Sequence, residues 1–359
     1  MKKTLIALAA VAATSAAFAQ SSVTIDGAVD LGYVKPIGSK DARLDATNGA
    51  NQIRFLGTED LGGGLKANFA LAQRFSPESG GNDGTANKRP TFQGETTVGL
   101  SGGFGSVKLG RALTAFQGPV NMTDPWGTLQ VGSSAVLTTA YATDPNGNID
   151  GSGLGRTDAI FYSSPNFSGF SFGLSLGLKT SGTANDLSAD KFACVDVADA
   201  STCAAGTDGI ADPDSLQAQS KGGNKKNLVS LWASYASGPL YIGGGYEQNR
   251  EDDQITAIVG TYNLGFMTVG AGFSSLDPIA SAKDRSSWNL MATAPMGAFL
   301  IKAGYGESKV SGDKASTKKL GLGVDYMLSK RTKVYASFGS DSVKTANKSG
   351  YDIGIRHTF

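Results

Sequence analysis

The sequence predicts an all-β fold: a sixteen-stranded antiparallel transmembrane β-barrel with short turns at one rim and long loops at the other. Three observations predict it. Many segments alternate apolar and polar residues with a period of two, the breaks between them alternate in length, and the chain begins with an export signal. Beyond that signal no apolar run approaches the roughly 20 residues that a membrane-spanning helix needs.

The strands are recognised by one apolar and one polar face. In 170–179 the even positions are Phe or Leu and the odd positions are Ser, Gly or Lys, and residues 351–359 alternate in the same way. A strand turns successive side chains to opposite faces, so each such segment has one face suited to lipid and one suited to water. Sixteen strands are expected near residues 22–35, 51–59, 65–76, 95–101, 106–113, 156–163, 169–179, 227–236, 239–249, 254–264, 266–276, 286–296, 298–308, 318–328, 332–340 and 349–359.

Short and long breaks follow one another along the chain. The short breaks are Gly-, Pro- or Ser-containing turns at 60–64, 102–105, 165–169, 238–239 and 329–330. The long, polar breaks are 36–50, 77–94, 114–155, 180–226, 277–285, 309–317 and 341–348. Outer-membrane barrels have short periplasmic turns and long extracellular loops, and an even strand number places both termini at the short-turn rim. A soluble β-sandwich is the alternative, but it would need apolar inner faces from both of its sheets.

The N-terminus predicts the compartment. Lys2 and Lys3 precede an apolar run over 5–13, and Ala17-Phe18-Ala19 forms a small-x-small cleavage site before Gln20. We therefore expect a signal peptide at 1–19 and a barrel over 20–359.

Composition excludes several classes of function. Without Lys2 and Lys3 the chain has 30 basic and 31 acidic residues, a net charge near −1, which does not indicate nucleic-acid binding. Cys194 and Cys203 fit a single structural disulfide in an exported protein, and the absence of a CxxC motif argues against a metal or redox site. The acidic stretch 208–214 resembles a Ca²⁺-binding turn in composition but not in spacing, and a solvated loop is favoured.

Catalysis and cofactors are not expected either. His357 is the single histidine, and its strand parity directs it outward, away from any solute in the lumen. No nucleophile-elbow, zinc-protease or phosphate-loop motif is present in the sequence.

Charged residues on the predicted inner face indicate a pore. A sixteen-stranded barrel leaves an aqueous channel, and rings of charge along its wall select ions by sign. Cations outnumber anions on this face, which predicts a preference for anions. The predicted inner charges are Asp26, Asp30, Arg54, Lys66, Arg74, Lys108, Arg156, Lys179, Lys302, Lys319, Asp325, Lys333 and Arg356. Arg111 breaks the alternation that Val107 and Leu109 set, so its side is left open.

The segment 114–155 is too apolar for a solvated loop. It contains Phe116, Trp126 and Tyr141, so we expect it to fold into the barrel and narrow it. Asp124 and Asp144 would then place negative charge opposite the basic wall, and the resulting transverse field would favour small polar solutes. The other long loop, 180–226, is expected to be extracellular.

Five stretches together resemble the general diffusion porins of Gram-negative bacteria, in particular the beta-proteobacterial type. They are SSVTIDGAVDLGY, GTEDLGGGLKANF, VGLSGGFGSVKLGR, DAIFYSSPNFSGFSF and the terminal IGIRHTF, and the likeness extends over essentially the whole chain. The resemblance implies a homotrimer of sixteen-stranded barrels whose third extracellular loop folds inward. It also implies that Arg54 and Arg156 belong to a wall arginine cluster, that Gly94 stands where a third arginine is usual, and that Phe359 is read by the outer-membrane barrel assembly machinery.

The sequence therefore predicts a passive outer-membrane porin, weakly selective for anions, without a cofactor or metal. Its wall would be formed by Arg54, Arg156, Lys66, Arg74, Lys108 and Arg111, and its constriction loop would contribute Asp124, Trp126 and Asp144. Expected partners are outer-membrane lipid, lipopolysaccharide and small anionic or neutral solutes. A substrate-specific channel is the alternative, and an adhesin or anchor with a plugged barrel is a third possibility.

Overall fold

The computed structural model describes residues 21–46, 51–81, 91–143, 155–178, 226–278, 283–344 and 346–359. The predicted signal peptide, the two cysteines, Asp144 and the 208–214 stretch lie outside the described residues, as does most of the 180–226 loop. None of the helices in the described part of the chain is long and apolar enough to span a membrane.

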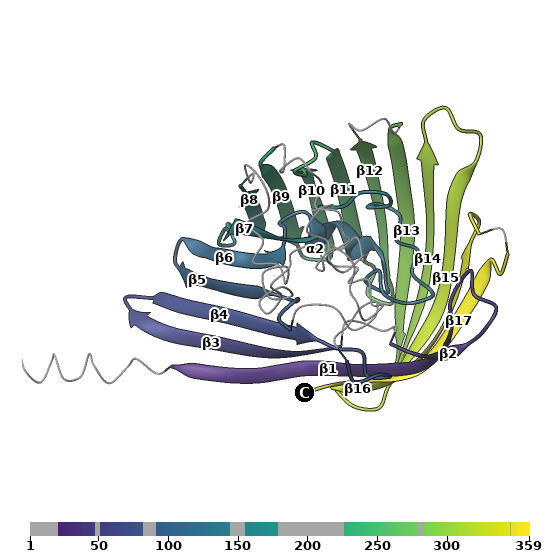
Figure 1. Ribbon diagram of the computed structural model, residues 1–359, viewed down its shortest axis with the longest axis horizontal. Helices are drawn as coiled ribbons and strands as arrows, with labels where there is room; N and C mark the ends of the chain where they lie inside the picture. The colour runs from purple at the N-terminus through teal and green to yellow at the C-terminus, as the bar shows by residue number, and fades with distance from the viewer. Residues whose placement is uncertain are drawn as a thin grey trace, which may run out of the picture.

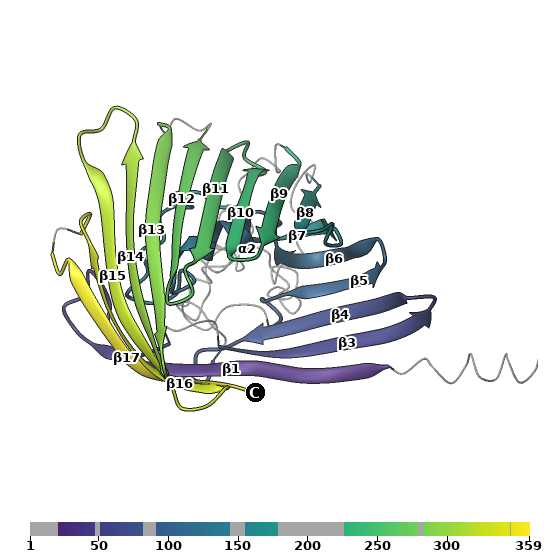
Figure 2. The same ribbon diagram turned by 180° about the vertical axis from the view of Figure 1, so that it is seen from behind.

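One antiparallel sheet runs around the whole molecule and encloses the segment that carries α2 (Figures 1 and 2). It has 17 strands, of which β2 is a three-residue piece beside β1, and the other sixteen form the barrel. The strands are β1 Ser22–Lys35, β2 Arg43–Asp45, β3 Gln52–Gly62, β4 Leu65–Arg74, β5 Thr96–Gly102, β6 Gly105–Leu113, β7 Arg156–Ser163, β8 Phe170–Gly177, β9 Leu228–Ser237, β10 Leu240–Gln248, β11 Gln254–Asn263, β12 Thr268–Asp277, β13 Arg285–Met296, β14 Phe299–Val310, β15 Ser316–Met327, β16 Thr332–Asp341 and β17 Ser349–Thr358.

The barrel closes between its first and last strands. Residues 28–35 of β1 pair with 351–358 of β17, while residues 22–28 pair with β3 on the other side. Gly27 and Phe359 exchange two backbone hydrogen bonds of 3.1 Å at the end of this seam. Because every barrel strand has two neighbours, the described sheet has no open edge, as a membrane-spanning sheet requires. The predicted sixteen-stranded antiparallel barrel is confirmed.

Connection lengths follow the predicted alternation with two exceptions. Tight turns at 63–64, 103–104, 238–239 and 297–298 mark one rim, and Gly63 and Gly64 take the positive φ angles of 61° and 82° that such a turn demands. The opposite rim carries the longer connections, but the links between β10 and β11 and between β14 and β15 comprise only residues 249–253 and 311–315.

The outer face is apolar and ends in aromatic residues at both rims. Ile25, Ile258 and Ile353 are among many aliphatic side chains that remain exposed there. Phe299 lies 4.7 Å from Tyr326, ring centre to ring centre, near the short-turn rim. Other ring pairs are Phe170–Tyr235 at the same rim and Trp288–Tyr305 and Tyr33–Tyr351 near the opposite rim. An apolar band between two aromatic belts is the surface that a lipid bilayer favours.

The buried core lies inside the barrel, where the 114–143 segment meets the inner wall. This segment contains the short helix α2 (Gln117–Val120) and the 3₁₀ turn η3 (Asn121–Thr123). Its apolar side chains are buried against β9, β11 and β12. The apolar character that distinguished this segment in the sequence is therefore explained by its place inside the barrel.

Candidate functional site

The inward segment is attached to the wall first by apolar packing. Phe116 meets Trp232 of β9 edge to face, with ring centres 5.7 Å apart. Val120, Leu137 and Tyr141 complete the loop's side of this cluster, and all are nearly inaccessible to solvent. Such aromatic contacts add to the stabilisation that apolar burial provides. The loop therefore has a fixed seat on β9–β12.

A buried carboxylate joins the two ends of the described segment. Glu247 of β10 is fully buried and accepts hydrogen bonds from the hydroxyl of Thr114, at the start of the segment, and from that of Thr143, at its end, the latter at 2.6 Å. Gln117 Nε2 donates to the Thr143 hydroxyl at 2.8 Å. Burial, with the nearby Glu247 adding to it, raises the pKa of Tyr141 well above its usual value, so that hydroxyl stays neutral. This cluster fixes the entry and exit of the loop.

Beyond the apolar seat the loop lies on inward-facing glycines of β14, β15 and β16. A Cβ atom built on Gly321 would lie 1.7 Å from the carbonyl oxygen of Gly132, and one on Gly339 would lie 1.8 Å from that of Val131. Gly304 and Gly306 face the loop in the same way. A glycine in a strand often marks the close approach of another backbone. These four residues, which we call the glycine bed, let the loop backbone touch the wall.

Asp124 and Trp126 both serve the loop's attachment. Asp124 Oδ2 accepts bonds from Thr128 N at 2.7 Å and Ser133 Oγ at 2.8 Å, while Oδ1 accepts from Ser134 N at 3.1 Å. The Asp124 side chain is therefore buried within the loop, whereas the sequence led us to expect it opposite the basic wall. Trp126 Nε1 donates to Ser337 Oγ of β16 at 3.2 Å.

Charged side chains beneath the loop are paired with one another. Lys302 Nζ lies 2.8 Å from Asp325 Oδ1, and Lys333 Nζ lies 2.6 Å from Asp325 Oδ2. Lys302 also sits 5.3 Å from the ring centre of Trp126, a cation–π distance. Asp352 Oδ2 accepts from Val131 N at 3.0 Å. The carboxylates on this side of the lumen are therefore covered by the loop and by lysines.

The opposite wall carries a second charged group. Arg54 binds Asp26 through two hydrogen bonds of 2.6 Å, and Lys108 Nζ lies 2.7 Å from Glu95 Oε1. Burial opposes ionisation of Glu95, but the hydrogen bond and charge of Lys108, with Arg54 nearby, outweigh it and hold the pKa of Glu95 below its usual value. Arg54, Asp26, Lys108 and Glu95 thus form one cluster, which we call the wall cluster. Sequence reasoning identified its two cations but did not include Glu95.

Gly94 stands where the resemblance implies an arginine, and the local packing explains the difference. Gly94 N donates to Ala72 O at 3.0 Å, and a Cβ atom on Gly94 would lie 2.7 Å from both Ala72 Cβ and Ala72 O. No larger side chain fits without moving β4. The neighbouring Arg74 is almost fully buried, and Lys66 is exposed near the short-turn rim, so neither belongs to the wall cluster.

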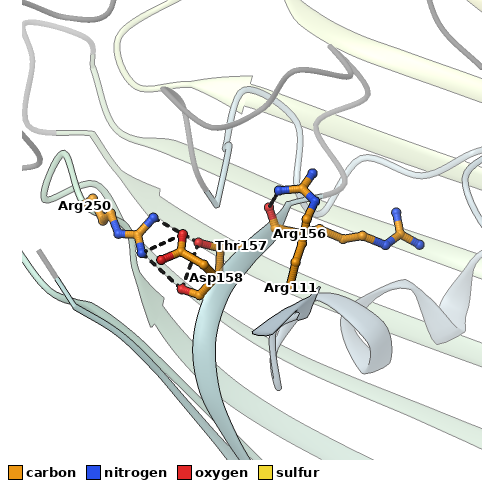
Figure 3. A network of polar contacts seen from close by, with 5 residues as sticks. All are labelled: Arg111, Arg156, Thr157, Asp158 and Arg250. Carbon is orange, nitrogen blue, oxygen red and sulfur yellow. Dashed lines mark hydrogen bonds and ion pairs between the residues drawn. The ribbon is translucent and has the colours of Figure 1, made fainter. Parts of the chain in front are cut away.

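Arg111 and Arg156 lie together near the long-connection rim (Figure 3). Arg111 donates to the backbone carbonyl of Gln93 at 3.3 Å and to that of Arg156 at 3.2 Å. Figure 3 shows the Arg156 guanidinium directed away from Arg250. The structure therefore brings Arg111 and Arg156 together.

Arg250 is a polar residue that the sequence did not single out. It lies in the short 249–253 connection, is almost fully buried, and donates to Thr157 Oγ1 at 3.1 Å and to Asp158 O at 3.0 Å. The β7–β8 ladder pairs only residues 160–163 with 173–176, and Arg250 donates to one backbone acceptor outside this ladder, the Asp158 carbonyl (Figure 3). No period-two signal exists within a turn, which is why its role was missed.

Comparison with known proteins agrees with this architecture. A family model described as Gram-negative porin matches residues 5–346. The chain is 30% identical to outer membrane porin protein 32 of Delftia acidovorans and 27% identical to an outer membrane porin protein of Bordetella pertussis, each over the full length of both chains.

Solved structures show the same fold. An anion-selective porin from Comamonas acidovorans matches with a TM-score of 0.70 and 24% identity, over 95% of this chain and all of that one. An outer-membrane protein of Vibrio cholerae in trimer form matches with a TM-score of 0.62 and 13% identity, over 94% and 99% of the two chains. With its closed barrel, apolar outer belt and loop folded into the lumen, the chain belongs to the Gram-negative porin family and is an outer-membrane porin.

Proposed function

We propose that this porin is a water-filled diffusion channel for small hydrophilic solutes with a weak preference for anions. The observation that carries the proposal is the unequal exposure of positive and negative side chains toward the lumen. Charged groups along a pore wall select ions by sign, and only groups that face the water act strongly on a passing ion.

Most inner-wall and loop carboxylates in the described part of the chain are covered. Each is at most 5% exposed, and the set consists of Asp30, Asp124, Glu247, Asp325 and Asp352. The side chains of Arg54, Lys108 and Lys333 are 38%, 36% and 21% exposed, and among their ion-pair partners in the described chain only Asp26 and Glu95 are exposed, at 28% and 32%. Three exposed cations thus face the lumen beside two exposed carboxylates, a small excess of positive charge.

The preference should be weak because the exposed cations are paired. Arg54 shares its charge with Asp26 and Lys108 with Glu95, so each pair has nearly zero net charge. The packing at Gly94 leaves no place for a further cation beside them. The name of the Comamonas structure, an anion-selective porin, agrees with the sign of this proposal.

We further propose the finer roles as follows. The 114–143 segment narrows the lumen opposite the wall cluster, Arg54 and Lys108 are its main charged wall residues, and Arg111 and Arg156 act at the extracellular mouth. Lys66 contributes charge near the periplasmic mouth, while Arg74 has a structural role. We propose no catalysis, since His357 is exposed near the short-turn rim and its Nδ1 lies 2.9 Å from the Thr332 hydroxyl.

Assembly partners also belong to the proposal. The trimer form of the Vibrio structure supports a homotrimer. The Phe359 side chain is exposed at the short-turn rim, and this position supports its recognition by the barrel assembly machinery. Lipopolysaccharide is the proposed lipid partner in the outer leaflet.

Planar-bilayer recording tests the proposal. Purified protein should insert in uniform conductance steps, and a KCl gradient should give a zero-current potential of anionic sign. A protein without steps would contradict the channel, and a cationic sign would contradict the selectivity. Saturable block by one class of solute would instead favour the substrate-specific channel.

A further inference from the structure

We infer that a recess in the lumen wall, at the base of the inward loop, binds an aromatic monocarboxylate of the benzoate type beside the diffusion path. It lies between the start of the 114–143 segment and the inner faces of β6–β9, and its volume is about 340 Å³. We call it the loop-base recess. A solute reaches it through the proposed water-filled channel, so this site rests on the proposed function.

The strand register brings the lining residues of the recess onto one patch of the wall. Lys108 of β6 pairs with Phe161 of β7, and Phe161 pairs with Ser175 of β8. One row nearer the short-turn rim, Gly173 of β8 pairs with Trp232 of β9. Residues directly opposite each other on antiparallel strands share a face of the sheet. A cation and two aromatic side chains therefore border a single hollow on the lumen side.

The hollow exists because small side chains meet where the loop leaves the wall. Ala115 N donates to Ser175 Oγ at 2.9 Å, and this bond holds the first residues of the loop on the long-connection side of the recess. Toward the short-turn rim, Gly173 has no side chain, and the hydroxyls of Ser171 and Ser234 lie 3.1 Å apart. The protein's own hydrogen bonds thus fix both ends of the recess. It is pre-formed, as ligand sites usually are.

The charge of the recess fits a monoanion. Among the described residues that line it, Lys108 is the one charged side chain, and none is a carboxylate. Lys108 Nζ donates to Glu95 Oε1 at 2.7 Å, but an ammonium group has three donors. The Lys108 side chain is 36% exposed, so a solute in the lumen can reach it. A monocarboxylate matches this single cation, whereas a dianion would leave one charge unopposed.

The apolar lining selects the rest of the ligand. Phe161 and Trp232 border the hollow from the wall, and Leu113 and Pro119 line it where the loop begins. Trp232 Nε1 donates to the Tyr241 hydroxyl at 3.3 Å, so the polar end of the indole is engaged within the wall. Aromatic side chains favour aromatic partners through offset or edge contacts. The volume lies at the small end of the roughly 300–1,000 Å³ range of ligand pockets, so a ligand with one ring fits.

The test is a fluorine NMR titration of 4-fluorobenzoate with the folded protein in detergent, with empty micelles as the blank. Two further probes separate the contributions: 4-fluorobenzamide keeps the ring without the charge, and fluoroacetate keeps the charge without the ring. Wild type should bind 4-fluorobenzoate saturably and more tightly than either probe. The charge alone should be worth roughly 10- to 150-fold in affinity, the range for a hydrogen bond to a charged group.

Two variants place the ligand in the recess. Ser171→Leu fills the hollow and should weaken binding of 4-fluorobenzoate about tenfold or more. Its matched control is Ser101→Leu on the lumen face of β5, outside the recess. Each substitution removes one serine side-chain contact, with Ser234 or with Asn68, and the control should bind as wild type. Lys108→Met should bind 4-fluorobenzoate no better than 4-fluorobenzamide, and its binding of 4-fluorobenzamide should equal that of wild type.

Equal affinity of wild type for the three probes, an equal loss in Ser171→Leu and Ser101→Leu, or unchanged binding of 4-fluorobenzoate by Lys108→Met would each overturn the inference. Because the recess lies beside the path, saturating 4-fluorobenzoate should leave the conductance steps of wild type open in planar bilayers, and complete closure would overturn this position. Steps recorded without any ligand report the channel alone. Normal steps with no saturable binding would therefore reject the recess and leave the proposed function standing.

Discussion

Replacing Gly321 by alanine should push the inward loop into the lumen and lower the single-channel conductance. The added Cβ would lie 1.7 Å from Gly132 O and 2.8 Å from Trp126 Cη2, whereas real Cβ atoms essentially never come closer than 3.0 Å. The wall cannot retreat, because β15 is hydrogen-bonded to β14 and β16 along its length. The loop must therefore move by about 1.5 Å toward the water, at an overpacking cost of about 1–3 kcal/mol.

The assay is single-channel recording together with the denaturant midpoint of unfolding. Gly323→Ala is the matched control, since it adds the same methyl group on the same strand and face but meets its nearest atom, Trp126 Nε1, at 3.0 Å. Gly321→Ala should conduct less and unfold earlier, while Gly323→Ala should stay close to wild type. If Gly321→Ala conducts as wild type does, or if both variants change equally, the glycine bed does not position the loop.

Three further variants test other contacts. Lys302→Met leaves buried Asp325 with Lys333 alone, so the free energy of unfolding should fall by roughly 3–5 kcal/mol. The control Lys330→Met, on the exposed rim, should stay within about 0.5 kcal/mol of wild type. Equal unfolding midpoints for the two variants would contradict a stabilising role of the Lys302–Asp325 ion pair. The pKa of Glu95 lies below the ordinary glutamate value of about 4.3. The anion preference should therefore rise only when the pH falls below that ordinary value, because Glu95 is then neutralised while Lys108 keeps its charge. Glu95→Gln should prefer anions more strongly already at neutral pH and lose that acid step, and a step that persists in this variant would show that another group titrates. Glu247→Leu leaves the hydroxyls of Thr114 and Thr143 without their acceptor, at a cost of about 1–3 kcal/mol each. The 114–143 segment should then be cleaved by protease more readily. Unchanged cleavage would show that Glu247 does not hold the two ends of the segment.

The barrel was predictable because its rules are local. Lipid demands an apolar side chain at every second position, so the period-two pattern located β1 at 22–35 and β7 at 156–163, the bounds that the structure gives. The closure between β1 and β17 followed from the strand count and the connection alternation. The predicted strands 239–249 and 254–264 also left a break at 250–253, within one residue of the observed connection, although it was not named among the long loops.

The site was less predictable because loop contacts are not periodic. The basic wall residues Arg54 and Lys108 could be found from strand parity, but their partners could be identified only in part. From the sequence, Asp124 could have faced either the lumen or its own loop. In the structure it faces the loop, because its carboxylate accepts hydrogen bonds from the backbone amides of Thr128 and Ser134. Likewise, nothing in the sequence separates the glycines that seat the loop from those in other strands.

The zero-current potential in a KCl gradient, measured for wild type and for Arg54→Gln, tests the central claim most directly. If covered carboxylates and exposed cations set the selectivity, wild type should show a small potential of anionic sign. Loss of Arg54 leaves Asp26 unopposed in the wall cluster, so the potential should shift toward the cationic side. A cationic potential in wild type, or an unchanged potential in Arg54→Gln, would contradict the account.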